Sequence, residues 1–206
     1  MEEKIFIEEF ASKEAGIEFV EGLNLEAYYH YKLDDNAILF GSRVPTELGQ
    51  LLSCTTPCEF TIGSVTFHSM EQAYYYMHTN FPEHRSKFMA CEKPFEATEY
   101  GRHLDATWFD EACHNHYIGW IELGDLENMA ILTNRIYWRC KNDENFRNAL
   151  LNTGDANLIE TDDWGGKDFC CYKYIDNGEE WAIGGNSTGK ALMFVRDSWE
   201  WRNGSK

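Results

Sequence analysis

The stretch FHSMEQAYYYMHTN, residues 67–80, constrains the fold of this chain more than any other. On an α-helix its acid, two of its tyrosines and its second histidine fall at i, i+3, i+4 and i+7, which is one face. These residues are Glu71, Tyr74, Tyr75 and His78. A soluble helix usually gives such a face to aliphatic core residues. The stretch is therefore either an unusual core helix or one wall of a site for a polar ligand.

The sequence before this helix predicts short strands. NAILFG, residues 36–41, is typical of a strand, and the loop SRVPTELGQ, residues 42–50, follows it. CEFTIGSVTF, residues 58–67, carries a Gly-Ser turn at its centre and predicts a β-hairpin. Ser69 then stands where the N-cap of the helix with Glu71 is expected.

The sequence after it predicts mainly helices. Pro82 and Pro94 stand at expected helix starts. Asp143 is expected to cap a helix that Gly154 ends, and residues 161–185 are predicted to form a glycine-rich loop. The predicted helices lie near 83–91, 94–102, 110–141 (two helices divided near Gly124), 144–152 and 187–201.

Helices dominate this pattern, and a few short strands accompany them. We therefore predict a compact α+β domain that is predominantly helical. Residues 1–35 are acidic and fit neither a strand nor a helix pattern clearly. They are predicted to be an N-terminal extension, and the domain proper is predicted to cover residues 36–206.

The charge of the chain limits its partners. It has 18 Lys and Arg against 35 Asp and Glu, a net charge of −17 over 206 residues. Nonspecific binding to a phosphate backbone depends on clustered Lys and Arg, so a long nucleic acid is not the expected partner. A small nucleotide needs only a few local donors, and it remains a candidate.

Cysteine usage and hydropathy suggest the compartment. The seven cysteines are odd in number and scattered, which favours free thiols in a reducing environment. The N-terminus lacks the basic and apolar regions of a secretion signal. Since no apolar run approaches the length of a membrane span, we expect a cytoplasmic protein without a membrane partner. The oligomeric state is left open.

Two familiar motifs are incomplete in this sequence. GGNSTGKA, residues 184–191, nearly fits the phosphate-binding loop, but Ala191 stands where a hydroxyl would hold magnesium. The preceding EEWAI is a poor buried strand, and too few residues follow Lys190 for the rest of such a fold. The spacing of the cysteines and histidines does not suggest a zinc site. We predict neither a metal ion nor a cofactor.

The carboxylates are the better catalytic candidates. Glu71 lies among aromatic residues, where burial favours a general acid or base. Asp162 and Asp163 precede Trp164 and Gly165, and the indole could stack on a base or sugar. Two carboxylates that flank a glycosidic bond are the usual apparatus for its hydrolysis. The alternative is a surface glutamate and a solvated acidic turn, and the residues alone leave it open.

Taken in order, several segments resemble the NADAR (YbiA-like) family. They are LSCTTPCEFTI (52–62), TFHSMEQAYYYM (66–77), PFEATEYGR (94–102), FRNALLNTGDANLIE (146–160) with the Asp-Trp-Gly that follows it, and WAIGGNSTGKALMFVRD (181–197). The resemblance covers roughly residues 36–198. It implies the YbiA-like α+β fold and N-glycosidase chemistry on a ribose. The implied substrates are ADP-ribosylated guanine or an intermediate of the riboflavin pathway.

The resemblance also implies a set of site residues. Glu71 corresponds to the motif glutamate and is the catalytic candidate, with Asp162 or Asp163 as the second carboxylate. The expected partner is a nucleotide or an ADP-ribosylated base, either free or in single-stranded nucleic acid. The residues assigned to ligand binding are Trp164, Gly165, Asn186, Gly189, Ser53, Tyr75, His78 and Arg102.

Two departures from the family pattern support a second hypothesis. The family usually has asparagine where this chain has Cys54, and it often has lysine where this chain has His78. If that lysine takes part in the chemistry, turnover is weakened here. The alternative function is therefore a protein that binds ADP-ribose or a nucleotide with little catalysis, in a regulatory or anti-defence role.

Overall fold

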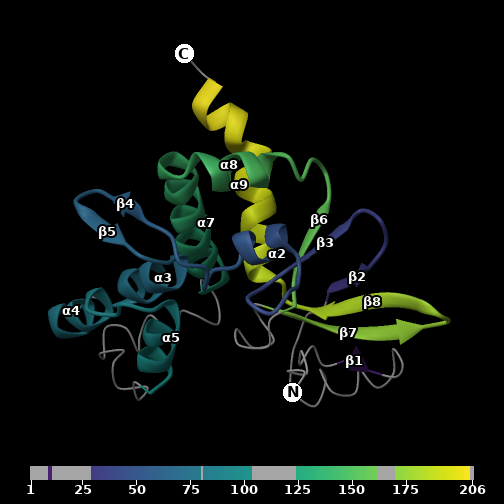
Figure 1. The fold of residues 1–206 in the computed structure, drawn as a ribbon, viewed down its shortest axis with the longest axis horizontal. Helices are drawn as coiled ribbons and strands as arrows, with labels where there is room; N and C mark the ends of the chain where they lie inside the picture. The colour runs from purple at the N-terminus through teal and green to yellow at the C-terminus, as the bar shows by residue number, and fades with distance from the viewer. Residues whose placement is uncertain (1–8, 11–28, 80, 104–123, 162–169, 205–206) are drawn as a thin grey trace. The chain divides into compact units, whose positions relative to one another are not determined.

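The computed structural model describes residues 9–10, 29–79, 81–103, 124–161 and 170–204 (Figure 1). The chain divides into two compact units. One consists of residues 1–53 and 148–206, and the other of residues 54–147. Helices predominate over short strands in the described residues, so the predicted α+β class is confirmed. The predicted boundary at residue 36 stays a prediction.

The unit of residues 54–147 combines a hairpin with helices. Strands β4 (Phe60–Ile62) and β5 (Val65–Phe67) pair antiparallel, with Gly63 at a positive φ of 62° in the turn. The helices are α3 (Met70–His78), α4 (Pro82–Met89), α5 (Pro94–His103) and α7 (Gly124–Asn142). The hairpin and the helix starts at Pro82, Pro94 and Gly124 agree with the sequence predictions.

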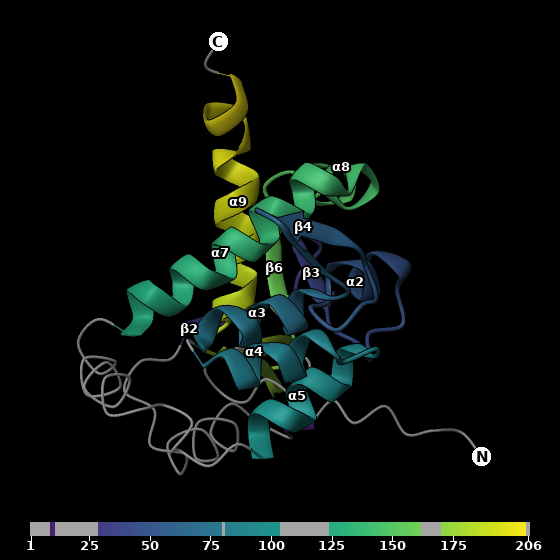
Figure 2. The same ribbon diagram turned by 90° about the vertical axis from the view of Figure 1, so that its left-hand side faces the viewer.

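Helix α3 is the centre of this unit. It packs against α4, α5, α7 and β5, and Figure 2 shows α4 and α5 close to it. Tyr75 of α3 stacks on Phe88 of α4, with ring centroids 5.4 Å apart and planes inclined by 15°. A Cβ at Gly101 of α5 would lie 2.2 Å from a ring carbon of Tyr75, so only glycine permits this approach.

The other unit contains a four-stranded sheet in the order β1-β7-β8-β2. Strand β1 (Glu9–Phe10) is parallel to β7 (Cys171–Asp176), whereas β8 (Glu179–Gly184) pairs antiparallel with both β7 and β2 (Tyr29–Lys32). Cys171 and Ala182 are buried together with Ile159 in a shared core.

A second, two-stranded sheet lies in the same unit. Strand β3 (Ala37–Phe40) is parallel to β6 (Asn157–Glu160), and the long helix α9 (Ser187–Gly204) packs on β6. The short helix α2 (Glu47–Leu52) packs on β3. The strand at 36–41 and the final helix were both predicted.

Helix α8 (Glu144–Leu151) begins as predicted. The Asp143 carboxylate accepts a hydrogen bond from the backbone N–H of Phe146 at 2.9 Å, which is the geometry of an N-cap. The helix ends at Leu151, and the chain turns at Gly154 with a φ of 60°. The helix predicted over residues 110–123 lies outside the described residues.

Two sequence predictions are wrong. The loop predicted at 42–50 contains the start of α2, because the Thr46 side chain accepts a hydrogen bond from Gly49 N–H and caps it. The glycine-rich loop predicted at 161–185 contains β7 and β8, so EEWAI is a strand after all. Asn177 and Gly178 join these strands with φ values of 52° and 83°. Such an Asn-Gly turn is the strongest short hairpin signal, and it was present in the sequence.

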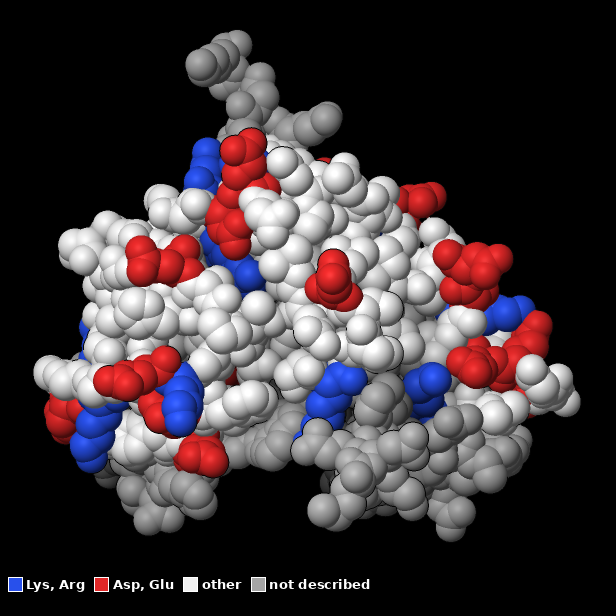
Figure 3. All heavy atoms as spheres, in the orientation of Figure 1, with Lys and Arg blue, Asp and Glu red and all other residues white. Residues whose placement is uncertain are grey.

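The surface charge agrees with the composition. On the face drawn in Figure 3, Asp and Glu side chains are scattered and Lys and Arg side chains stand among them in small groups. A broad basic field of the kind that grips duplex phosphates is not visible on the described part of that face. None of the described helices is long and apolar enough to cross a membrane.

Candidate active site

The start of α3 is fixed by several hydrogen bonds between side chains and backbone. The Ser69 hydroxyl accepts from Gln72 N–H at 3.0 Å, which confirms the predicted N-cap. The Gln72 amide oxygen accepts from His68 N–H at 2.7 Å, and its nitrogen donates to the carbonyl of Phe88 at 2.8 Å. The first turn of α3 is therefore tied both to the chain before it and to α4.

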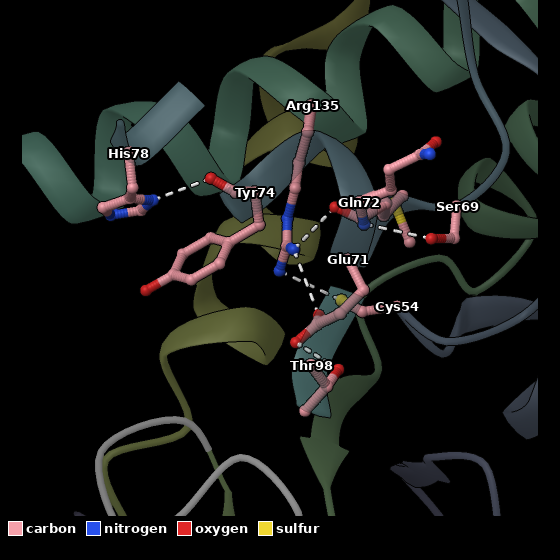
Figure 4. A network of polar contacts seen from close by, with 9 residues as sticks. Cys54, Ser69, Glu71, Gln72, Tyr74, His78, Thr98 and Arg135 are labelled. Atoms are coloured by element: carbon pink, nitrogen blue, oxygen red, sulfur yellow. Dashed lines mark hydrogen bonds and ion pairs between the residues drawn. The ribbon is translucent and has the colours of Figure 1, made fainter. Parts of the chain in front are cut away.

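Glu71 lies in this fixed turn, and its side chain is not completely buried. Its side chain is 18% exposed. One carboxylate oxygen accepts from the Thr98 hydroxyl of α5 at 3.3 Å, and the other lies 3.5 Å from a guanidinium nitrogen of Arg135 of α7 (Figure 4). Both contacts are long for hydrogen bonds. The carboxylate is thus oriented from two helices while it keeps acceptor capacity for a ligand.

Arg135 contributes a buried positive charge to this turn. Its side chain is only 2% exposed. Its guanidinium donates to the carbonyl of Met70 at 2.9 Å and to the Cys54 sulfur at 3.1 Å, and it lies 4.9 Å from the centroid of the Tyr74 ring. The backbone N–H of Glu71 donates to the carbonyl of Cys54 at 3.1 Å. Cys54, Glu71 and Arg135 therefore form one connected polar group.

Tyr74 and His78 continue the same face of α3. The His78 Nδ1 bonds to the carbonyl of Tyr74 at 2.8 Å, and the ring centroids lie 4.0 Å apart. Burial lowers the pKa of His78 to about 4, so its imidazole is neutral at neutral pH. Burial also raises the pKa of Tyr74 well above its ordinary value, which keeps the phenol protonated.

The residues on this face of α3 therefore have two kinds of surroundings. Tyr75 packs between Phe88 and Gly101, as a core residue does. Glu71 joins the polar group around Arg135, and Tyr74 covers the guanidinium with its ring. The core alternative is therefore realised for Tyr75, and a ligand site at Glu71 stays a prediction. The assignment of Tyr75 and His78 to ligand binding stays a prediction.

Asn186 and Gly189 belong to the other unit. The Asn186 side-chain oxygen accepts from Glu160 N–H at 3.0 Å, and its nitrogen donates to the carbonyl of Leu158 at 2.9 Å. A Cβ at Gly189 would lie 2.2 Å from the same carbonyl oxygen. These contacts join the start of α9 to β6, and ligand binding by either residue stays a prediction.

The structure gives fewer contacts for the remaining predicted site residues. Ser53 is buried, and its N–H bonds to the carbonyl of Gln50 at the end of α2. Arg102 lies in α5, but its side chain is not among those the structure describes. The others lie outside the described residues, and they are Asp162, Asp163, Trp164 and Gly165.

Sequence reasoning missed Arg135 and Thr98. Arg135 stands among apolar residues at helical spacing, between the buried Leu132 and Ile136. A cation on the apolar face of a predicted helix is expensive unless it is paired, so this position was a usable signal. Thr98 gave no comparable signal, because a threonine inside a helix is ordinary.

Burial disfavours thiolate chemistry at several of the described cysteines. Those cysteines are free. Burial raises the pKa of Cys140 to about 12 and raises that of Cys171 further, which disfavours the nucleophilic thiolate. Within the part of the chain that the structure describes, the acids, histidines and cysteines form no group of three or more that could hold a metal ion.

Comparisons with known proteins agree with the resemblance seen in the sequence. The model of the NADAR domain matches residues 40–200. The NMR structure of the E. coli protein YbiA matches with a TM-score of 0.58 and 13% identity, over 85% of this chain and 92% of that one. At this identity the match shows the fold alone. No curated protein matches the sequence significantly. The chain belongs to the NADAR family, which includes N-glycosidases.

Proposed function

We propose that this protein is an N-glycosidase that hydrolyses the bond between a base and a ribose. The proposed substrates are ADP-ribosylated guanine, as a nucleoside or in single-stranded nucleic acid, and an intermediate of the riboflavin pathway. The observation that carries the proposal is the Glu71 carboxylate, which is oriented from α5 and α7 and belongs to a partly exposed side chain. Membership of the NADAR family supports the type of reaction.

The proposed reaction breaks one bond and forms one. The C1′–N bond of the substrate breaks, and its electron pair leaves with the base, which takes up a proton. The oxygen of a water molecule forms the new bond to C1′ and gives up a proton. In the transition state the ribose carries positive charge that resembles an oxocarbenium ion. Glu71 would stabilise this charge or direct the water, which are the two roles open to a carboxylate at C1′.

A second carboxylate and a stacking surface complete the proposal. Asp162 or Asp163 would act as the second carboxylate, and Trp164 would stack on the base or the sugar. The first turn of α9, which follows Asn186, would offer N–H groups to a phosphate. A reducing cytoplasm is the proposed compartment, and the free thiols among the described cysteines are consistent with it.

The rival function is ADP-ribose or nucleotide binding without efficient turnover. One observation favours it. His78 is neutral at neutral pH, because burial lowers its pKa to about 4. It therefore cannot supply the positive charge of the lysine that relatives often carry at this position. If that charge is essential in the form of a lysine, this protein binds the substrate but does not release the base.

The test is a base-release assay with the Glu71→Gln variant. Wild-type protein is incubated with ADP-ribosylated guanosine and, separately, with the riboflavin-pathway intermediate, and the free base is quantified. We expect release by the wild type and a loss of roughly 100-fold or more in the variant. Glu83→Gln is the matched control, because Glu83 is an exposed acid in the first turn of α4. It should release base at the wild-type rate.

The outcomes separate the two functions. Undiminished turnover in Glu71→Gln would remove Glu71 from the mechanism. If the wild type releases no base, calorimetry with ADP-ribose shows whether the protein binds this ligand without turnover. Binding without release would establish the rival function, and the absence of both would contradict the two proposals together.

A further inference from the structure

Arg135 is placed to act on Glu71 from a separate helix. It comes from α7, it is almost completely buried, and its guanidinium reaches the first turn of α3 (Figure 4). A guanidinium keeps its proton in any protein environment. The turn that bears Glu71 therefore has a permanent positive charge beside it, whatever the pH.

The hydrogen bonds of Arg135 show what holds it in place. Its shorter contacts are with the carbonyl of Met70, at 2.9 Å, and with the sulfur of Cys54, at 3.1 Å. The contact with Glu71 is longer, at 3.5 Å. The guanidinium is therefore fixed by groups other than the carboxylate that it attracts. Movement of the carboxylate toward a ligand would not release the cation.

Among the described residues, the cation beside this face of α3 is Arg135 of α7 and not His78. His78 is neutral at neutral pH, and its Nδ1 bonds to the carbonyl of Tyr74. The positive charge of Arg135 is itself one of the causes that lower the pKa of His78, after burial. A second cation beside the guanidinium is thus disfavoured, and the positive charge of the site stays on α7.

We propose that Arg135 is a positioning residue, which holds the carboxylate of Glu71 in one orientation toward the ribose of the substrate. The inference rests on the proposed function. Thr98 contacts one oxygen of the carboxylate and Arg135 the other, so the two residues fix its plane from two helices. Arg135 acts through Glu71 and has no contact with the substrate in this role.

The first test compares Arg135→Lys and Arg135→Met in the base-release assay. Lysine keeps the charge, but a single ammonium cannot reproduce the fork that bonds to Met70 and Cys54. We expect kcat to fall roughly 10- to 100-fold in Arg135→Lys, because a misplaced catalytic group loses rate on this scale. KM should stay nearly unchanged. Arg135→Met should lose more, and thermal unfolding shows whether each variant is folded.

Arg139→Lys is the matched control for the loss of a buried arginine. Arg139 stands one helical turn later in α7 and is 1% exposed, and its guanidinium lies 3.9 Å from the centroid of the Phe146 ring. It has no contact with Glu71 among the described interactions. Arg139→Lys should therefore lower the thermal stability while kcat stays at the wild-type value.

A double variant asks whether Arg135 acts through Glu71. Single-turnover base release is measured with excess protein for Glu71→Gln alone and combined with Arg135→Lys. If Arg135 positions the carboxylate, the second substitution adds no further loss of rate. A further loss as large as that of Arg135→Lys alone would overturn the inference, because Arg135 would then act independently.

The remaining outcomes distinguish this inference from the proposed function. Base release by the wild type with unchanged kcat in both Arg135 variants would overturn the positioning role and leave the proposed function standing. A rise in KM with unchanged kcat would also overturn the positioning role, since it would make Arg135 a binding residue. No release by the wild type would overturn both.

Discussion

Asn186 and Glu71 are polar residues at the beginnings of two helices, and they are held in opposite ways. The Asn186 side chain is completely buried, and both ends of its amide bond to the backbone of β6, at 3.0 and 2.9 Å. The Glu71 side chain is 18% exposed, and its carboxylate has contacts of 3.3 and 3.5 Å. Both polar atoms of the Asn186 amide bond to the backbone of β6, whereas the carboxylate of Glu71 can still accept hydrogen bonds from another molecule.

This difference separates a structural polar group from a candidate catalytic one. Asn186 adopts a φ of 51°, an unusual conformation for a residue other than glycine, and its two backbone bonds compensate for it. Glu71 is in ordinary helical backbone, and the unusual feature lies instead in the buried cation beside it. Both residues were assigned to the site from the sequence, and both assignments stay predictions; of the two side chains, that of Glu71 is partly exposed and that of Asn186 is buried.

The largest effect on stability is expected from Asn186→Ala. The substitution leaves Glu160 N–H and the Leu158 carbonyl without their partner, at about 1–3 kcal/mol each. Alanine in the left-handed conformation costs about 1 kcal/mol more. We expect the free energy of unfolding, measured by denaturant titration, to fall by about 4 kcal/mol.

Asn177→Ala is the control for this prediction. Asn177 has nearly the same φ, 52°, but it is exposed and its side chain bonds to the Asp176 carboxylate. Its replacement should cost only about 1 kcal/mol. Equal losses in the two variants would contradict the comparison, because they would leave no contribution for the buried amide of Asn186.

A smaller change in the free energy of unfolding is expected from the protonation of His78 as the pH falls. The pKa of His78 is about 4 in the folded protein and about 6.5 in an unfolded chain. The unfolded state therefore binds the proton first, and the stability contributed at neutral pH is lost as the pH falls from 6.5 toward 4. The full difference corresponds to about 3 kcal/mol, and solvent near this half-buried residue reduces it to about 2 kcal/mol.

His78→Gln removes this contribution. The variant should lose less stability than the wild type between pH 7 and pH 4, measured as the free energy of unfolding at a series of pH values. The same pH dependence in both proteins would mean that His78 is not kept neutral by the fold. Arg135 would then have to share the face of α3 with a second cation.

The smallest effect is expected from Thr98→Val. Valine keeps the shape of threonine and removes only the 3.3 Å hydrogen bond to Glu71. The carboxylate oxygen is then free to bond to water, so we expect a loss of about 0.5 kcal/mol in the free energy of unfolding. A loss of 2 kcal/mol would show that the carboxylate is held as tightly as the amide of Asn186, which would remove the distinction between them.

Much of the fold was predictable, because it depends on local patterns. The caps at Ser69 and Asp143, the hairpin at 58–67 and the helix start at Pro82 each follow from a few adjacent residues. The hairpin of β7 and β8 was predictable as well, from its Asn-Gly turn, but the abundant glycines of 161–185 suggested a loop instead.

The candidate site was less predictable, because its contacts join residues far apart in the chain. Glu71 could be proposed from its aromatic neighbours and from the resemblance to the family. Its contacts with Thr98 and Arg135 span 27 and 64 positions, and periodicity within one helix does not reveal such pairs. The low pKa of His78 comes from burial, which the sequence of α3 alone does not reveal.

The central claim is that Glu71 acts on the C1′ atom of a bound ribose. The most direct measurement is a crystal structure of the Glu71→Gln variant with ADP-ribosylated guanosine, in which slow turnover preserves the substrate. We predict that C1′ lies about 3–3.5 Å from the side chain of residue 71, or from a water molecule bonded to it. A substrate bound with C1′ out of reach of residue 71, even through one water molecule, would contradict the account.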